Sequence, residues 1–173
     1  MRNSFRTNVE FGAQIAIAIS VVIVAGLLIK RVGFPQQPIA RSVPSISAGE
    51  RLNLRDVDWK QNKKSLVFFL KKDCHYCTSS AALYHQLLDD ATKRNVRCIA
   101  VLPDSLEDAR KYLQYLELPF ENIYTGPVED NTISGTPTVV FVDEGGIVKS
   151  VWIGAQGKRE KEMRDTLVQL FDS

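Results

Sequence analysis

Two cysteines, Cys74 and Cys77, stand three residues apart just after a short, wholly apolar stretch, residues 66–70. Such a stretch is typical of a strand covered on both faces, and we expect the next helix to begin at the cysteines. A thiol at a helix N-terminus faces free backbone N–H groups and the positive end of the helix dipole, which lower its pKa. The second sulfur can reach the first across one helical turn. The pattern therefore predicts a reactive dithiol that can close into a small disulfide ring.

A zinc or copper site is the alternative interpretation of this pair. One CxxC motif supplies only two of the four ligands that such a site needs. The sequence has no second CxxC and no His-x-x-x-His, and its further soft ligands are Cys98, His75 and His85. Cys98 lies in an apolar stretch, where a small buried thiol is the usual explanation, and we expect His85 to be a solvated helix residue. We therefore favour a redox dithiol and expect neither a metal nor another cofactor.

The composition narrows the class of protein. With 173 residues, of which 45% are hydrophobic, the chain is long enough for one folded domain and a tail. Its 22 basic and 20 acidic side chains are mixed along the sequence and leave a net charge of +2. No basic block indicates nucleic acid as a partner. Three cysteines are also too few for the dense disulfide framework of a small secreted domain.

No charged residue occurs between Glu10 and Lys30. Residues 11–29 form an almost wholly apolar segment, which as a helix with a rise of ~1.5 Å per residue would reach roughly 28 Å. That length matches the hydrocarbon core of a bilayer, so we predict a transmembrane anchor at 11–29 after an N-terminal tail, residues 1–10. A cleaved signal peptide is the main alternative, but its apolar region is usually shorter and no A-x-A-like cleavage site follows. A buried soluble helix is disfavoured because apolar side chains cover every face.

The orientation of this anchor does not follow from charge, since basic residues flank both of its ends: Arg2 and Arg6 on one side, and Lys30, Arg31 and Arg41 on the other. We expect the C-terminal domain on the periplasmic, extracytoplasmic side, because the N-terminal tail is short. Residues 30–48 carry three prolines among serines without helical or strand periodicity, which predicts a semi-extended tether. The tether would hold the folded part, residues 49–173, off the membrane so that a protein substrate can approach.

Apolar stretches and helical periods alternate from residue 49 onward. Residues 66–70 and 96–102 have the character of buried strands. Helical spacing between them is shown by Tyr84, Leu87, Leu88 and Ala91. A second helix is expected to begin at Ser105, with Asp108 three residues later as in a capping box.

The C-terminal third of the chain predicts a hairpin followed by a helix. Residues 138–142 and 147–153 flank Asp143-Glu144-Gly145-Gly146, a sequence typical of a tight turn between two strands. An amphipathic closing helix is indicated by Met163, Leu167, Leu170 and Phe171. We also allow for an extra strand at residues 51–54. Strands joined through helices should be parallel and the final hairpin antiparallel, so the sequence predicts an α/β fold with a mixed central sheet and helices on both faces.

A second motif, Gly135-Thr136-Pro137-Thr138, stands directly before the first strand of this hairpin. Proline cannot donate to a sheet ladder and is tolerated at the start of a strand, where a tight turn can hold it in the cis form. An ordinary trans turn proline is the commoner case. The residues around Pro137 therefore leave both forms open.

Taken together, the two motifs resemble the thioredoxin superfamily. The resemblance rests on Phe68-Phe69-Leu70 leading into Cys74-His75-Tyr76-Cys77, and on Gly135-Thr136-Pro137-Thr138 leading into an apolar strand, Gly146 and Gly154. It covers roughly residues 49–171 and is closest to the membrane-anchored TlpA/ResA-like thiol-disulfide oxidoreductases, whose anchor and tether are also similar. That branch carries additional structure between the two motifs, matching residues 120–133 here.

The resemblance implies a role for each site residue. Cys74 would be the exposed attacking cysteine and Cys77 the resolving one, while His75 and Tyr76, inside the ring, would tune the redox couple. Pro137 would be cis, and the backbone of Thr136 would pair with the substrate chain.

The chain also departs from the family pattern. Asp73 stands where many relatives have tryptophan, Phe68 where thioredoxins place a buried acidic residue, and Ser80 where some ResA-like proteins have glutamate. A proton acceptor for Cys77 is therefore unassigned.

The leading hypothesis is a membrane-tethered enzyme that reduces or exchanges protein disulfides outside the cytoplasm. Its partners would be disulfide-containing or dithiol proteins, a membrane or extracytoplasmic redox partner that resets the centre, and the lipid bilayer through residues 11–29. The alternatives are an oxidase of the same fold that donates disulfides, and a non-enzymatic metal-handling or redox-sensing module. A peroxidase is disfavoured because no isolated peroxidatic cysteine pattern is evident.

Overall fold

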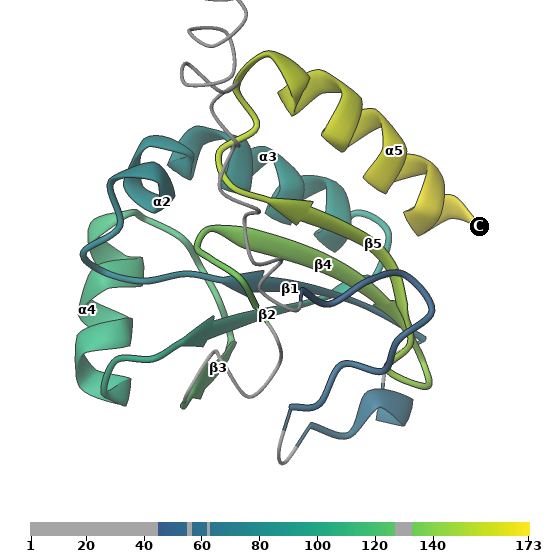
Figure 1. The fold of residues 1–173 in the computed structure, drawn as a ribbon, viewed down its shortest axis with the longest axis horizontal. Coiled ribbons are helices and arrows are strands. Elements are labelled where there is room, and N and C mark those ends of the chain that lie inside the picture. The colour runs from purple at the N-terminus through teal and green to yellow at the C-terminus, as the bar shows by residue number, and fades with distance from the viewer. Residues whose placement is uncertain (1–44, 55–56, 62, 127–132) are drawn as a thin grey trace, which may run out of the picture. The chain divides into compact units, whose positions relative to one another are not determined.

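A five-stranded mixed sheet forms the centre of the part of the chain that the computed structural model describes, residues 45–54, 57–61, 63–126 and 133–173. The strands lie in the order β3-β2-β1-β4-β5 (Figure 1). Their bounds are β1 (Lys64–Phe69), β2 (Arg97–Leu102), β3 (Asn122–Thr125), β4 (Thr138–Asp143) and β5 (Val148–Ile153). The predicted α/β fold with a mixed central sheet is thus confirmed.

The helices fall close to the predicted positions. They are α2 (His75–Ser79), α3 (Ala81–Thr92), α4 (Leu106–Tyr115) and α5 (Glu160–Asp172), with 3-10 turns η1 (Trp59–Gln61) and η3 (Gly157–Arg159). The predicted cap of α4 is present, because the Ser105 hydroxyl accepts a hydrogen bond from the Asp108 N–H at 3.2 Å. This bond satisfies one of the free N–H groups of the first turn.

One predicted strand direction is wrong. The sequence pattern joined residues 96–102 to 138–142 through a helix and so predicted parallel strands, whereas β4 runs antiparallel to β1. The reason is a strand that the pattern missed: α4 leads into β3, which pairs in parallel with β2. Because β3 is four residues long and only half-buried, it has no apolar run to mark it.

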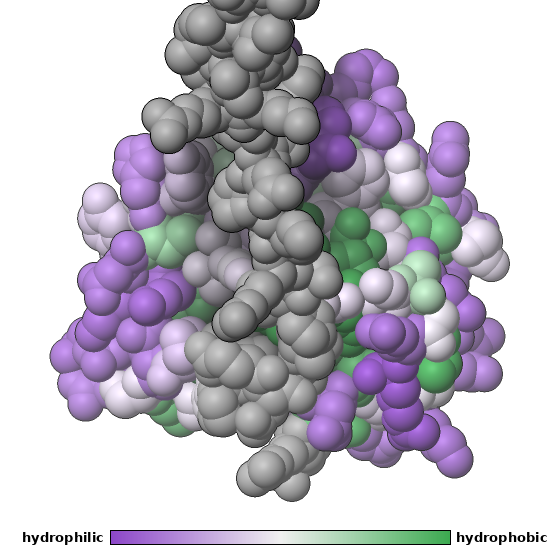
Figure 2. Space-filling view, in the orientation of Figure 1, coloured by the Kyte–Doolittle hydropathy of each residue, from purple (hydrophilic) through white to green (hydrophobic). Residues whose placement is uncertain are grey.

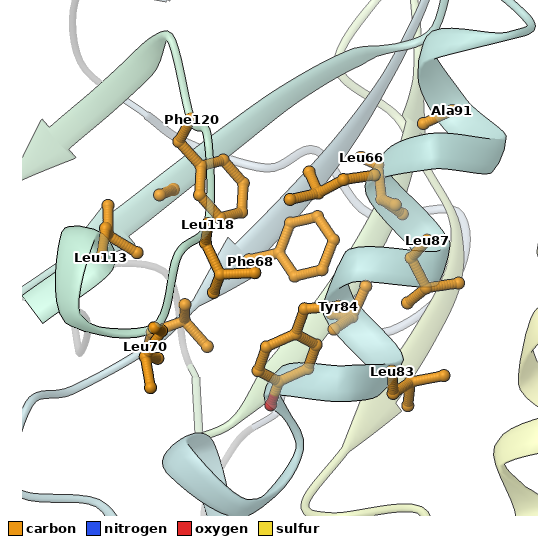
Figure 3. Packing of buried hydrophobic residues seen from close by; sticks show 14 of the residues in the cluster. Leu66, Phe68, Leu70, Leu83, Tyr84, Leu87, Ala91, Leu113, Leu118 and Phe120 are labelled. Atoms are coloured by element: carbon orange, nitrogen blue, oxygen red, sulfur yellow. The ribbon is translucent and has the colours of Figure 1, made fainter.

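The α-helices pack against one face of the sheet. Leu66 and Phe68 of β1 lie in a core cluster with Tyr84 and Leu87 of α3 and with Leu113 of α4 (Figure 3). This cluster also includes Leu167 of α5. The side chains of β1 that point the other way, Val67 and Phe69, belong to a second cluster.

The other face of the sheet is covered by an irregular segment, so the predicted helices on both faces are not found among the described residues. There, Ile46, Leu52 and Trp59 pack against the sheet together with Ile133, and η1 lies on the opposite side of the sheet from α3 and α5 (Figure 1). The connections from β1 to β2 and from β2 to β3 proceed in the same direction across the sheet. Right-handed crossovers in one direction place their helices on the same face.

The start of the described chain is part of this packing. Ile46 is 5% exposed, and it precedes residue 49, the predicted start of the folded part. The Gly49 N–H donates to the Val148 carbonyl at 2.9 Å. The extra strand allowed for at 51–54 is reduced to a single antiparallel bridge, Arg51 to Ile147.

The predicted anchor at 11–29 and the tether up to residue 44 lie outside the described residues. Within the described residues, no helix has both the length and the apolar character that crossing a bilayer requires. The described surface in the view of Figure 2 is largely hydrophilic, with hydrophobic residues exposed in smaller groups. The large hydrophobic side chains that are most exposed among these residues are Tyr76, Leu106, Tyr115 and Ile153.

Candidate active site

Cys74 lies between the end of β1 and the start of α2. The Leu70 N–H still donates to the Val101 carbonyl of β2 at 3.0 Å, and the Cys74 N–H then closes a turn onto the Lys71 carbonyl at 3.2 Å. Cys74 is the N-cap residue of α2, with extended backbone angles, and its Sγ accepts a hydrogen bond from the Cys77 N–H at 3.2 Å. The sulfur thus takes the place that a serine or aspartate oxygen has in an ordinary cap.

The two sulfurs have different surroundings. Cys77, on the buried face of α2, is completely buried in the core cluster, whereas Cys74 is half-buried. Both are free thiols. Burial raises the pKa of Cys74, but hydrogen bonds from the side chains of Cys77 and Thr136 and from the backbone of Cys77 and Tyr76 outweigh it. The Cys74 pKa therefore lies below its ordinary value. Burial and the neighbouring Cys74 side chain raise the pKa of Cys77 to about 12. The pair therefore consists of one reactive thiol and one that stays protonated.

The Pro137 loop lies against this pair because of the sheet register. The last residue of β1, Phe69, is opposite the first residue of β4, Thr138. The loop that leads into β4 therefore meets the loop that leads out of β1. In the thiol form, Cys74 Sγ–H donates to the Thr136 carbonyl oxygen at 3.3 Å.

The Thr136–Pro137 peptide bond is cis, as the family resemblance implied. Two further hydrogen bonds hold this loop. The Thr138 hydroxyl donates to the Gly135 carbonyl at 2.7 Å, and the Gly154 N–H, just after β5, donates to the Pro137 carbonyl at 2.7 Å. The second motif is thus placed beside Cys74, where a chain bound at this sulfur would meet the backbone of Thr136.

The two residues between the cysteines are exposed. Tyr76 is 61% exposed, and the rings of His75 and Tyr76 meet edge to face with their centroids 5.7 Å apart. Lys72, whose charge would also favour a thiolate, has its ammonium 3.9 Å from Asp104 and 3.4 Å from Asp108. Because these two carboxylates offset its charge, Lys72 stabilises the Cys74 thiolate less than an unpaired lysine at this position would.

Three polar groups near the dithiol were not singled out from the sequence. The Thr78 hydroxyl is 3.1 Å from the Tyr112 hydroxyl, and Tyr84 is buried in the same core cluster as Cys77. Burial, and then the thiolate charges of Cys77 and Cys74, raise the pKa of both tyrosines. In the sequence, Tyr84 belongs to an apolar helix stripe, where an aromatic ring is normally only core packing.

The third cysteine lies at the other end of the sheet. Cys98 pairs with Leu66, near the start of β1, whereas Cys74 follows the end of that strand. Burial raises the pKa of Cys98 to about 12. His85 is exposed on α3, with Nε2 3.0 Å from the Leu116 carbonyl. In the described part of the chain, no three side chains of the metal-binding types come together.

Comparison with known proteins agrees with this geometry. The model of the AhpC/TSA family matches residues 39–151, well over half of the chain. No curated protein sequence matches the chain.

Solved structures with this fold include proteins of thiol-disulfide exchange. A candidate thiol:disulfide interchange protein DsbE from Chlorobium tepidum is 18% identical over 73% of this chain and 99% of its own, with a TM-score of 0.58. The thioredoxin domain of a thiol-disulfide oxidoreductase from Bacteroides vulgatus is 19% identical over 72% of this chain and 99% of its own, with a TM-score of 0.57. A thiol:disulfide interchange protein from a Bacteroides species is 18% identical over 76% of this chain and 91% of its own, with a TM-score of 0.54. At these identities the likeness shows the thioredoxin-like fold.

The difference in pKa predicts selective alkylation. With iodoacetamide at neutral pH, we expect Cys74 to react faster than Cys77 by roughly thirtyfold or more. The thiolate fraction falls tenfold for each unit by which the pKa rises, and the greater nucleophilicity of the more basic thiolate offsets about half of this decrease on a logarithmic scale. Peptide mass spectrometry after timed labelling measures the three rates separately. Cys98 is the internal control and should stay as slow as Cys77. Equal labelling of Cys74 and Cys77 would contradict the assignment.

Proposed function

The chain belongs to the AhpC/TSA family and has the thioredoxin-like fold of thiol-disulfide oxidoreductases, and on that premise we propose that it reduces or exchanges disulfides of protein substrates through Cys74 and Cys77. The observation that carries the proposal is the unequal pair of thiols. Cys74 is half-buried, at a helix cap, with a lowered pKa, and Cys77 is buried with a pKa of about 12. Thiol-disulfide exchange uses one cysteine that attacks the substrate disulfide and a second that resolves the mixed disulfide.

The reaction follows from the geometry. The Cys74 thiolate attacks one sulfur of a substrate disulfide, and the other substrate sulfur leaves as a thiolate and takes up a proton. Cys77 then loses its proton and attacks the Cys74 sulfur, which releases the second substrate sulfur and closes the Cys74–Cys77 disulfide. The cap hydrogen bond from the Cys77 N–H stabilises the Cys74 thiolate before the first step. We infer that the backbone of Thr136, whose carbonyl lies 3.3 Å from the Cys74 sulfur, pairs with the substrate chain during the attack.

We favour the reductive direction. A disulfide becomes more oxidising when its reduced form is stabilised as a thiolate. Here the environment stabilises a thiolate at Cys74 and opposes one at Cys77. Only Cys74 is stabilised as a thiolate, so the pair is less oxidising than one in which both sulfurs were stabilised, and we propose reduction of the substrate as its direction. A redox partner, in the membrane or outside the cytoplasm, would then reduce the Cys74–Cys77 disulfide again.

A trapping experiment tests the exchange reaction. In a Cys77→Ala variant the resolving sulfur is absent, so we expect a mixed disulfide between Cys74 and its substrates to accumulate in cells. Diagonal gel electrophoresis and mass spectrometry identify the trapped proteins. Cys74→Ala is the matched control, which should trap nothing because Cys77 is buried and protonated.

Two results would count against exchange. One is an equal yield of mixed disulfides from the two variants. The other is rapid consumption of hydrogen peroxide by the reduced protein while a protein disulfide such as that of insulin stays oxidised, because that outcome indicates a peroxidase.

The membrane attachment is part of the same proposal. Support comes from the charge-free, apolar residues 11–29 and from the proline-containing segment that follows them. A single pass would keep the redox domain beside a membrane-bound electron donor, on the periplasmic side, where protein disulfides form.

Alkaline extraction of cell membranes checks the anchor. We expect the full chain to stay in the membrane pellet, because residues 11–29 are long enough to cross the hydrocarbon core. A variant lacking residues 1–30 is the control and should be released. Protease added to intact spheroplasts should degrade the domain if it lies outside the cytoplasm. Release of the full chain, or complete protection from protease, would contradict this part of the proposal.

A further inference from the structure

A buried phenol lies beneath the dithiol and has no part in the reaction described above. Tyr84, on the first turn of α3, is 2% exposed. Its ring meets the ring of Phe68 edge to face, with the centroids 5.6 Å apart. A long helical side chain points back toward the N-terminus of its own helix. In Figure 3 the Tyr84 hydroxyl accordingly points away from Phe68, toward the short helix α2, which carries Cys77.

The Tyr84 hydroxyl is buried without a hydrogen-bond partner among the described residues. Burial raises its pKa, the Ser80 side chain lowers it without reaching ordinary hydrogen-bond geometry, and thiolate charge at Cys77 and Cys74 raises it further. The phenol is therefore within electrostatic range of the dithiol. Tyr84 and Cys77 also belong to the same core cluster.

Such a hydroxyl is unfavourable for stability alone. A buried polar atom that forms no hydrogen bond destabilises the folded state. Phenylalanine at position 84 would keep the ring contact with Phe68 and remove that penalty. The hydroxyl therefore suits a state other than the resting dithiol, one in which a negative charge appears beside it.

The resolving step supplies that charge. Cys77 has to become a thiolate, although burial and the Cys74 side chain raise its pKa to about 12. Among the described residues, the main groups that shift the pKa of Cys77 include no carboxylate. A hydrogen-bond donor in the core would stabilise the thiolate without adding a second negative charge.

We propose that Tyr84 donates a hydrogen bond to the Cys77 thiolate as it forms, and so promotes release of the substrate; the inference rests on the proposed exchange function. In this step the Cys77 proton passes to solvent, the bond between the Cys77 and Cys74 sulfurs forms, and the bond between Cys74 and the substrate sulfur breaks. The substrate leaves as a thiolate and takes up a proton from solvent. Tyr84 keeps its own proton throughout. Only the turn at Ser80 separates α2, which carries Cys77, from α3, which carries Tyr84.

Tyr112 is a natural comparison. Its phenol is also buried, and its pKa is raised by burial and by the same two thiols. However, its hydroxyl is 3.1 Å from the Thr78 hydroxyl and so is already paired. Loss of the Tyr112 hydroxyl should therefore disturb the core without removing a free donor beside Cys77.

The test separates the two steps of exchange. The reduced full chain, in detergent and carrying Cys98→Ser, is mixed with one equivalent of dithiobis(nitrobenzoate). The first release of thionitrobenzoate reports the attack by Cys74, and the second reports displacement by Cys77. Both phases are followed by stopped-flow absorbance across a range of pH, for the parent, Tyr84→Phe and Tyr112→Phe.

For Tyr84→Phe we expect a second phase slower by about tenfold or more, the size of a lost hydrogen bond to a charged group. Its pH profile should move to higher pH, the first phase should stay within about twofold of the parent, and the melting temperature should not fall. For Tyr112→Phe the second phase should stay within about twofold. A Tyr84→Phe second phase equal to that of the parent, or equal slowing in both variants, would overturn the inference. A parent chain with a first phase and no second phase would instead refute the exchange function itself.

Discussion

The site depends on the pairing of β1 with β4. Because Phe69, at the end of one strand, lies opposite Thr138, at the start of the other, two loops from distant parts of the sequence meet at one edge of the sheet. One carries Cys74 to the cap of α2, and the other presents the Thr136 carbonyl 3.3 Å from its sulfur. The apolar side chains of these strands pack into both core clusters, so the free energy of hydrophobic burial also fixes the geometry of the site.

The same arrangement makes the two thiols unequal. The helix that begins at Cys74 turns Cys77 into the core, where burial raises its pKa to about 12. Hydrogen bonds from the side chains of Cys77 and Thr136, and then from backbone N–H groups, lower the pKa of Cys74. A dithiol in which both sulfurs were exposed would have no such order of reaction. The cost of this asymmetry is a resolving sulfur that is hard to deprotonate, and a buried phenol without a partner lies in the same cluster.

Most of the fold and the two cysteines at the centre of the site could be predicted from the sequence, because they follow strong local patterns. Strands β1 and β2 have apolar stretches and helix α3 has a helical period. The hairpin turn is marked by Gly145 and Gly146, the second of which has φ +74°. The sequence pattern did not reveal β3, whose four residues are half-buried. Because this strand was missed, the predicted direction of β4 was wrong. The sequence pattern also could not show that an irregular segment covers one face of the sheet, because Leu52 and Trp59 have no regular spacing. The unpartnered hydroxyl of Tyr84 could be recognised only in the structure, because a stripe of buried residues in the sequence does not show whether a hydroxyl has a hydrogen-bond partner.

The central claim is that Cys74 and Cys77 form one reversible redox couple. Equilibrating the full chain in dithiothreitol buffers of graded composition, trapping the thiols with acid and measuring the disulfide fraction by mass spectrometry tests it directly. We expect a single two-electron transition between Cys74 and Cys77, with a potential near or below about −250 mV, as for a reductant, and a Cys98 thiol that stays free throughout. The absence of a Cys74–Cys77 disulfide at every buffer composition would show that the two cysteines do not form a redox couple.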